Sequence, residues 1–359
     1  MPATPPEAPD LPSYAPGALA FVGLAKNAGK TTALQFVLES AVRDGRTVGL
    51  VSVGRDGEAR DGRTGAEKPP LVLPAGGLVV GAGPVLDASS IRLEFLDRLG
   101  FSTPSGETVL ARAVDPGTVE VTGLRHLEDV ERAIGLLHTA GADLVLVDGA
   151  YGRRAVAGLS AVDAVVVSTG AVVADDVESV VDATEDTVSR LRIDRASQGT
   201  ERELLGRSIE EDVCLLVRPD GPERVLGGSS TRRALDPGLP EPLPEESLLA
   251  VPGMIGREAA QLLMESAPSG ARLLVRSGAV LTMPGGTWRQ LREQWQIRAF
   301  HSISVSAISC NPTSPRDSGR DLDRRQLLRG VRRRFPDLTV FDAVAARGRR
   351  HGRSDARSG

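Results

Sequence analysis

The residues best suited to chemistry lie in one glycine-rich stretch, Gly23 to Thr32, with the sequence GLAKNAGKTT. We interpret it as the phosphate-binding pattern G-x-x-x-x-G-K-[ST], because it stands between a predicted strand and a predicted helix. Glycines let backbone N–H groups turn inward around phosphates, and the following helix directs its positive end at them. The residues expected to contact a nucleotide are Gly23, Lys26, Asn27, Ala28, Gly29, Lys30, Thr31 and Thr32.

Three side chains of this loop have separate expected roles. Lys30 would neutralise the β- and γ-phosphate oxygens, and the Thr31 hydroxyl would coordinate Mg²⁺. Lys26 either reaches the phosphates of this or a neighbouring subunit, which leaves a homodimer open, or is simply solvated. The alternative to a phosphate-binding loop is that the whole glycine-rich stretch only caps a strand before the helix begins and has no ligand.

Carboxylates after two other apolar stretches complete the expected site. Asp148 ends the run LVLVD, and an acid ending a buried strand is costly to desolvate without a cation or a donor. We predict that it holds Mg²⁺ through water, the alternative being a structural cap of the next turn. Asp56 could orient Mg²⁺ or an attacking water, or could belong to an Asp-Gly turn without a chemical role. The expected catalytic set is therefore Lys30, Asp56 and Asp148, and the expected metal ligands are Thr31 and Asp148.

The composition argues against several classes of function. A net charge of −4 gives no reason to expect a nucleic-acid partner, which needs a clustered positive surface. The two cysteines, Cys214 and Cys310, lie far apart and outside any ligand-like spacing, and the four histidines are isolated. No apolar run is long enough to cross a bilayer and no signal peptide is recognisable, so we expect a cytoplasmic protein without membrane contact.

The hydrophobic pattern predicts the sheet that must position these residues. Aromatic content of 3% leaves the core to Val, Leu and Ala, which suits parallel strands covered by helices. A strand–helix–strand unit opens at residue 18, and the parallel pattern resumes with a helix at 127–140 and strands at 143–147 and 164–167. Between them we expect a helix at 91–99 and a hairpin of 108–114 with 118–122. The last strand–helix–strand pattern of the chain, from 302 onward, is assigned to the second domain.

The predicted fold is of the α/β class: a P-loop NTPase with a mostly parallel sheet and helices on both faces, plus a smaller α/β domain. A length of 359 residues has room for both domains. The expected parts are a disordered leader (1–17), a nucleotide-binding domain (18–194), a linker region (195–246), a smaller α/β domain (247–345) and a disordered basic tail (346–359).

Five stretches together resemble a known family. They are residues 23–32, VSVGRDGE at 51–58, KPPLVLPAGGLVV at 68–80, VLVDGA at 145–150 and CNPTSP at 310–315. The set resembles the accessory subunit encoded with lysine 5,6-aminomutase in lysine-fermentation clusters. This resemblance implies part of an ATP-dependent reactivating factor for an adenosylcobalamin enzyme, with that aminomutase as protein client and a MutS-like ATPase as partner.

A more distant resemblance rests on the loop and the strand-end VDGA. Over residues 18–191 the chain looks like the P-loop proteins that include dethiobiotin synthetase and the molybdenum-cofactor accessory GTPase. The implied cofactors are Mg²⁺ and ATP, with GTP as the alternative, although no N-K-x-D guanine-reading motif appears. Three functions follow: an ATPase that services a client enzyme, an enzyme that phosphorylates a small carboxylate or amine, and a nucleotide-binding scaffold without hydrolysis.

Overall fold

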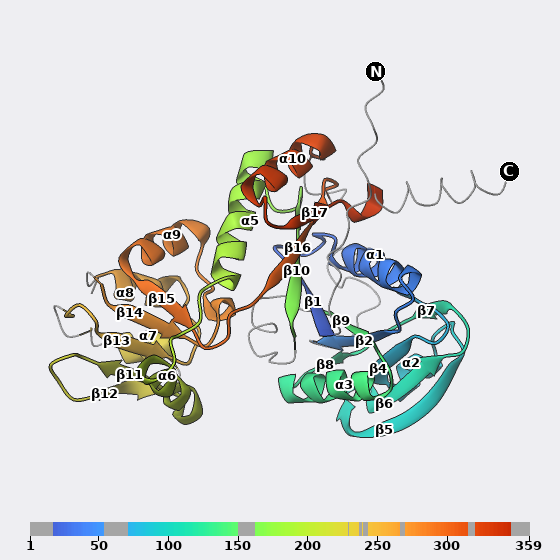
Figure 1. Cartoon of the computed structure of the whole chain (residues 1–359), viewed down its shortest axis with the longest axis horizontal. Helices are drawn as coiled ribbons and strands as arrows, with labels where there is room; N and C mark the ends of the chain where they lie inside the picture. The colour runs from blue at the N-terminus through green and yellow to red at the C-terminus, as the bar shows by residue number, and fades with distance from the viewer. Residues whose placement is uncertain are drawn as a thin grey trace. The chain divides into compact units, whose positions relative to one another are not determined.

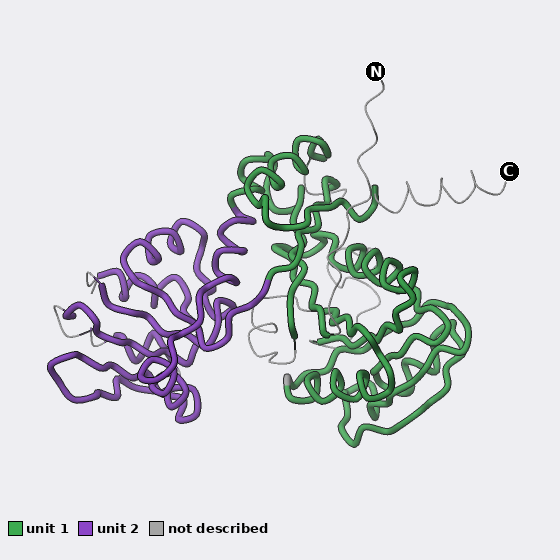
Figure 2. Tube along the Cα trace, viewed as in Figure 1, with its two compact units in different colours: residues 1–182, 305–359 green, residues 183–304 purple. Residues whose placement is uncertain are grey.

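The computed structural model describes residues 17–53, 71–149, 162–228, 230–236, 239, 243–265, 270–314 and 320–345. The chain forms two compact units, shown in separate colours in Figure 2. Unit 1 comprises Met1–Asp182 and Val305–Gly359, and unit 2 comprises Ala183–Ser304. The second unit is therefore inserted into the first along the chain rather than appended to it.

Unit 1 is built on a large mixed sheet in which most strands are parallel (Figure 1). The described strands follow the order β17-β16-β10-β1-β9-β2-β4-β6-β5, with β8 beside β2. The antiparallel members are β6 and β5 at one end. Their bounds are β1 Gly17–Gly23, β2 Val48–Val53, β4 Leu78–Ala82, β5 Leu93–Thr103, β6 Gly106–Ala113, β8 Gly123–Leu124, β9 Leu144–Asp148, β10 Ala164–Gly170, β16 Val305–Asn311 and β17 Thr339–Phe341.

Helix α1 covers one face of this sheet because alternate strand residues point toward it. Leu19 and Phe21 of β1 share a buried cluster with Leu34 and Phe36 of α1, and the Phe36 ring stacks on Phe341 of β17. A small antiparallel pair, β3 with β7, joins the same cluster. The bounds are α1 Lys30–Arg43, α2 Gly83–Asp87, α3 Leu127–Thr139, α5 Val177–Leu191, α10 Arg324–Arg334, β3 Leu71–Leu73 and β7 Gly117–Val119.

Unit 2 has its own smaller mixed sheet, in the order β12-β11-β13-β14-β15. Strands β13, β14 and β15 are parallel, whereas β11 is antiparallel to both neighbours. The bounds are α6 Thr200–Glu211, β11 Val213–Val217, β12 Arg224–Gly228, α7 Thr231–Leu235, β13 Leu248–Val251, α8 Arg257–Glu265, β14 Arg272–Val275, α9 Gly285–Gln294 and β15 Gln296–Ala299. The structure thus confirms the α/β class, the mostly parallel large sheet and a second, smaller sheet.

Several elements differ from the sequence-based expectation. Residues 195–246, expected to be a linker, supply α6, β11, β12 and α7 to unit 2. Strands β16 and β17, expected in the second domain, extend the large sheet next to β10. The expected helix at 91–99 is instead strand β5, and β6 pairs with β4 and β5 rather than with 118–122. Pairing with the distant strand β10 places β16 in the large sheet, whereas at 91–99 pairing in a hairpin with β6 overrides the helical pattern. The expected leader and tail lie outside the described residues, apart from Gly17, which begins β1.

In the described ranges, none of the helices combines the length and hydrophobicity that a membrane span requires.

A buried carboxylate ties two elements of unit 2 together. Glu201 of α6 is 6% exposed; its carboxylate accepts hydrogen bonds from the Ser197 N–H at 2.7 Å and from Arg272 Nη1 at 2.9 Å. Burial by itself would raise the pKa of Glu201, but the Ser197 donor and the Arg272 charge together lower the pKa below its usual value. The ionised form is therefore the one that the native state stabilises.

We expect Glu201→Gln to lower the free energy of unfolding by about 2 kcal/mol at pH 7, since a charge-assisted bond is lost. Because the native pKa is lowered, this stabilisation is present above the unfolded-state pKa of Glu and disappears as the pH falls through the native pKa. Urea unfolding of both proteins from pH 7 to pH 3 measures the difference. Glu203→Gln, at an exposed position of the same helix, is the control, and a pH-independent difference for Glu201→Gln would contradict the assignment.

Candidate functional site

The ends of five neighbouring strands meet at one edge of the large sheet. In sheet order β16, β10, β1, β9 and β2 are parallel, so their last residues lie on the same side (Figure 1). The register pairs Gly23 with Ser168, Asp148 with Ser52 and Gly170 with Asn311. The loop that was predicted from sequence therefore lies between the ends of β10 and β9.

The loop connects the last residue of β1, Gly23, directly to the first residue of α1, Lys30. Two of its residues have left-handed backbone conformations, Asn27 at φ 63° and Gly29 at φ 92°. Gly29 is the N-cap of α1 and has no side chain that could accept from the first N–H groups of the helix. These N–H groups need acceptors, and an anion at the helix start is a suitable one.

The side chain of Lys30 lies over the beginning of the loop. A Cβ atom placed on Gly23 would lie 2.9 Å from Lys30 Nζ and 3.0 Å from the Ala25 carbonyl oxygen. Glycine at position 23 thus leaves room for the ammonium group beside the backbone. This arrangement puts a positive charge next to the helix start.

The spacing of the loop differs from the pattern used to interpret it. Five residues, not four, separate Gly23 from Gly29, so the four-residue form of the pattern starts at Leu24. The Gly29-Lys30-Thr31 end matches without change. The Leu24 N–H donates to the Ser168 carbonyl of β10 at 3.0 Å, which fixes the start of the longer loop.

Asp148 lies at the end of β9, the strand between β1 and β2, and α1 contacts this strand. It is half-buried, and no basic side chain of the described residues pairs with it. The next residue, Gly149, has φ 79°, and a Cβ there would collide with the Val53 carbonyl oxygen. Only glycine therefore fits at the position directly after the carboxylate.

The other predicted residues have mixed outcomes. Lys26 and Asn27 are exposed, Ala28 is buried, and Gly29 to Thr32 are half-buried. Asp56, with its neighbours Arg55 and Glu58, lies outside the described residues. Ser168 and Thr169, near the end of β10, are fully buried. The backbone of β10 supports the loop through the Ser168 carbonyl.

Asn311 is a residue of this edge to which sequence reasoning gave no individual role. It ends β16, and its Nδ2 donates to the Asn27 carbonyl oxygen at 3.3 Å. A Cβ on Gly29 would lie 3.3 Å from the Asn311 Cβ. The available signal was the run CNPTSP after an apolar strand, which contributed to the resemblance but did not indicate a contact with the loop.

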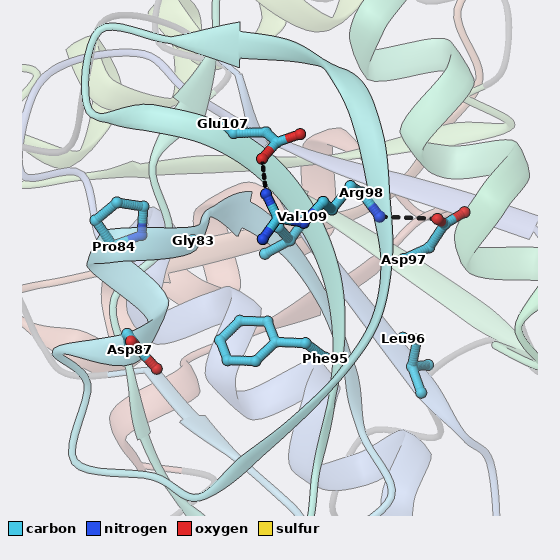
Figure 3. A pocket seen from close by; sticks show the side chains of 9 residues that line it. All are labelled: Gly83, Pro84, Asp87, Phe95, Leu96, Asp97, Arg98, Glu107 and Val109. Carbon is cyan, nitrogen blue, oxygen red and sulfur yellow. Dashed lines mark hydrogen bonds and ion pairs between the residues drawn. The ribbon is translucent and has the colours of Figure 1, made fainter.

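A groove of about 770 Å³ lies on the β4–β6–β5 side of the same sheet, beside α2 (Figure 3). Because β4 is parallel to β2, α2 begins at the sheet edge that carries the loop. In this view Phe95, 46% exposed, lies beside Asp87 and below the ion pair of Arg98 with Glu107. The lining thus combines an aromatic surface with charged groups.

Neither cysteine is suited to thiolate chemistry. Burial raises the pKa of Cys310 to about 12, with Asp342 acting in the same direction and Arg332 opposing it. Burial likewise raises the pKa of Cys214 to about 11. Within the described residues, no group of three or more His, Cys, Asp and Glu side chains could hold a metal ion.

No family model matches the chain, and no curated protein or solved structure matches it significantly.

We expect both thiols of the folded protein to resist alkylation at pH 7.5, because the thiolate is the reactive form and both cysteines are buried. Mass spectrometry after brief iodoacetamide treatment should find no adduct on the native chain and two adducts in 6 M guanidinium chloride. Rapid modification of Cys310 under native conditions would show that the end of β16 opens.

Proposed function

We propose that this chain is a Mg²⁺-dependent P-loop protein that binds and hydrolyses a nucleoside triphosphate, ATP in the first place and GTP as the alternative. The observation that carries the proposal is the position of Lys30 and Thr31 at the start of a helix whose N-cap is the left-handed Gly29, beside the strand that ends in Asp148. Phosphate groups bind readily at such a helix start, and a carboxylate on the neighbouring strand suits a hydrated Mg²⁺.

In this proposal each residue has one task. Lys30 balances the charge of the β- and γ-phosphates, and backbone N–H groups from Ala28 to Thr32 bind their oxygens. The Thr31 hydroxyl and Asp148, the latter through water, hold Mg²⁺, which neutralises charge on the transferred phosphoryl group when bound. Asp56 is retained as the residue that orients the attacking water, on sequence grounds.

The resemblance to the aminomutase accessory subunit supplies the proposed biological role. We infer that the nucleotide cycle services an adenosylcobalamin-dependent aminomutase, with a MutS-like ATPase as partner. The expected result is ATP turnover that rises when the client enzyme is added. If ATP turnover does not change when such a protein is added, this role is refuted, whereas the proposed nucleotide site is unaffected by the result.

One observation favours a second candidate, a kinase or ligase for a small acceptor, as in dethiobiotin synthetase. The groove beside α2 begins at the same sheet edge as the loop and has the volume of a small-molecule site. Here ADP release should depend on a small carboxylate or amine and not on a protein. Asp87→Asn, which changes the groove and leaves the loop intact, should then alter the KM for the acceptor only.

We expect Lys30→Ala to weaken binding of ATP by about 100-fold, because charge-assisted bonds to two phosphates are lost. Isothermal titration calorimetry with Mg²⁺ present measures this, and hydrolysis should fall to background. The control is Arg43→Ala, which removes an exposed cation from the other end of the same helix. Unchanged affinity in the Lys30 variant would eliminate the site.

We expect Asp148→Asn to weaken the binding of Mg²⁺ and to leave the metal-free binding of the nucleotide unchanged. Affinity for ATP in EDTA should stay unchanged, whereas the apparent affinity for Mg²⁺ should fall by about tenfold to 100-fold. Titration of hydrolysis against Mg²⁺ measures the shift, with Asp44→Asn at the exposed end of α1 as the control. If affinity for ATP falls equally with Mg²⁺ and in EDTA, Asp148 has a structural role.

A further inference from the structure

A side chain from near the end of the chain reaches the proposed phosphate loop. Asn311 and Asn27 are 284 positions apart, yet Asn311 Nδ2 donates to the Asn27 carbonyl oxygen at 3.3 Å. We infer that Asn311 is a positioning residue, which holds the loop in the form that binds the triphosphate. The inference rests on the proposed function and adds to it a residue from β16.

The contact determines which way one peptide group points. The carbonyl of Asn27 and the N–H of Ala28 belong to the same planar trans peptide, so they point in opposite directions. With the carbonyl held by Asn311, the Ala28 N–H is directed across the loop, where it lies 3.4 Å from the Ala25 carbonyl oxygen. This distance is long for a hydrogen bond, so a phosphate oxygen can replace the weak internal acceptor.

Asn311 also packs against the N-cap of α1. Its Cβ would lie 3.3 Å from a Cβ built on Gly29, and Gly29 has the left-handed φ of 92°. A larger residue at either position would push the helix start away from β16. The same side chain thus bonds to one left-handed residue of the loop, Asn27, and lies beside the other, Gly29.

The amide of Asn311 is itself held in one orientation. Its Oδ1 accepts from the Thr313 N–H at 3.1 Å, so Nδ2 is directed at the loop. Its backbone carbonyl accepts from the Ala171 N–H at 2.9 Å, and Gly170 leaves room for that approach. Because β10 also holds Leu24 through the Ser168 carbonyl, both ends of the loop are anchored to one rigid strand pair.

A residue that positions backbone N–H groups acts on the phosphates and not on the base. We expect Asn311→Ala to weaken binding of Mg·ATP, Mg·GTP and inorganic tripolyphosphate by a common factor of about five to ten. Asn311→Asp keeps the shape of the side chain but removes the donor and adds a negative charge, so it should weaken binding of the three probes by a larger factor. Thr313→Ala should change nothing, because Thr313 contacts Asn311 through its backbone N–H.

A second measurement does not require any ligand. Hydrogen exchange of the nucleotide-free protein, followed by mass spectrometry, should show faster exchange at residues 24–30 in Asn311→Ala and unchanged exchange in the strands of unit 2. The circular dichroism spectrum reports whether the variant is folded. Unchanged exchange in a folded variant overturns the inference, whatever its affinity for nucleotides.

The binding outcomes separate the inference from the proposed function. If the unaltered chain binds none of the three probes, both fail. If Lys30→Ala abolishes binding while Asn311→Ala leaves it intact, only the inference fails. A loss confined to ATP or confined to GTP also overturns it, because that result assigns Asn311 to contact with the base.

Discussion

The parallel pairing of β1 with β9 on one side and β10 on the other is the constraint on which the site depends. Ala20 pairs with Val147, and Val22 pairs with Val167. All four are buried, so a slip of one residue would exchange the side chains that face α1 with those of the opposite face and disrupt the packing on both. The register that buries these residues is the same register that brings the glycine-rich loop next to Asp148.

Close approach of backbones at the sheet edge imposes a second constraint. Gly149 lies against the Val53 carbonyl, and Gly170 lies against the Asn311 carbonyl. Both glycines have positive φ, so an added Cβ would meet strain as well as a collision. At both points glycine is the residue that allows the two backbones to approach each other.

Local signals in the sequence predicted the elements whose stability depends on neighbouring residues. The helix predicted at 127–140 and the strand predicted at 143–147 lie within one residue of α3 and β9, because hydrophobic period and flanking residues suffice there. The glycine-rich loop and Asp148 were likewise found from spacing and position. The helix expected at 91–99 shows the limit, since Leu93, Leu96 and Leu99 have helical spacing, yet the segment pairs with β6.

Long-range pairing could not be predicted in the same way. Val165 pairs with Val305, and the whole of unit 2 lies between them in sequence. No hydrophobic period within either segment indicates that β10 pairs with β16. For this reason β16 was assigned to the wrong domain, and no contact was predicted for Asn311. The contribution of Asn311 to the loop depends on that pairing and could be recognised only once it was known.

The charges at helix starts argue that the loop is more than a structural cap. The other described helices of nine or more residues have a carboxylate at the N-terminus, as the helix dipole favours: Glu128 in α3, Glu178 in α5, Glu201 in α6, Glu258 in α8, Asp186 beside Gly285 of α9 and Asp323 in α10. Helix α1 has no acid in its first turn and begins with Lys30.

A cation at the positive end of a helix is unfavourable unless an anion lies between them. A loop with a purely structural purpose would gain stability from an acidic residue in the first turn of α1, as α3 does from Glu128. Lysine at position 30 does not provide that gain. Because α1 has no acidic residue in its first turn, the space beside its first N–H groups suits a negative group from outside the helix, such as the phosphate of the proposed ligand.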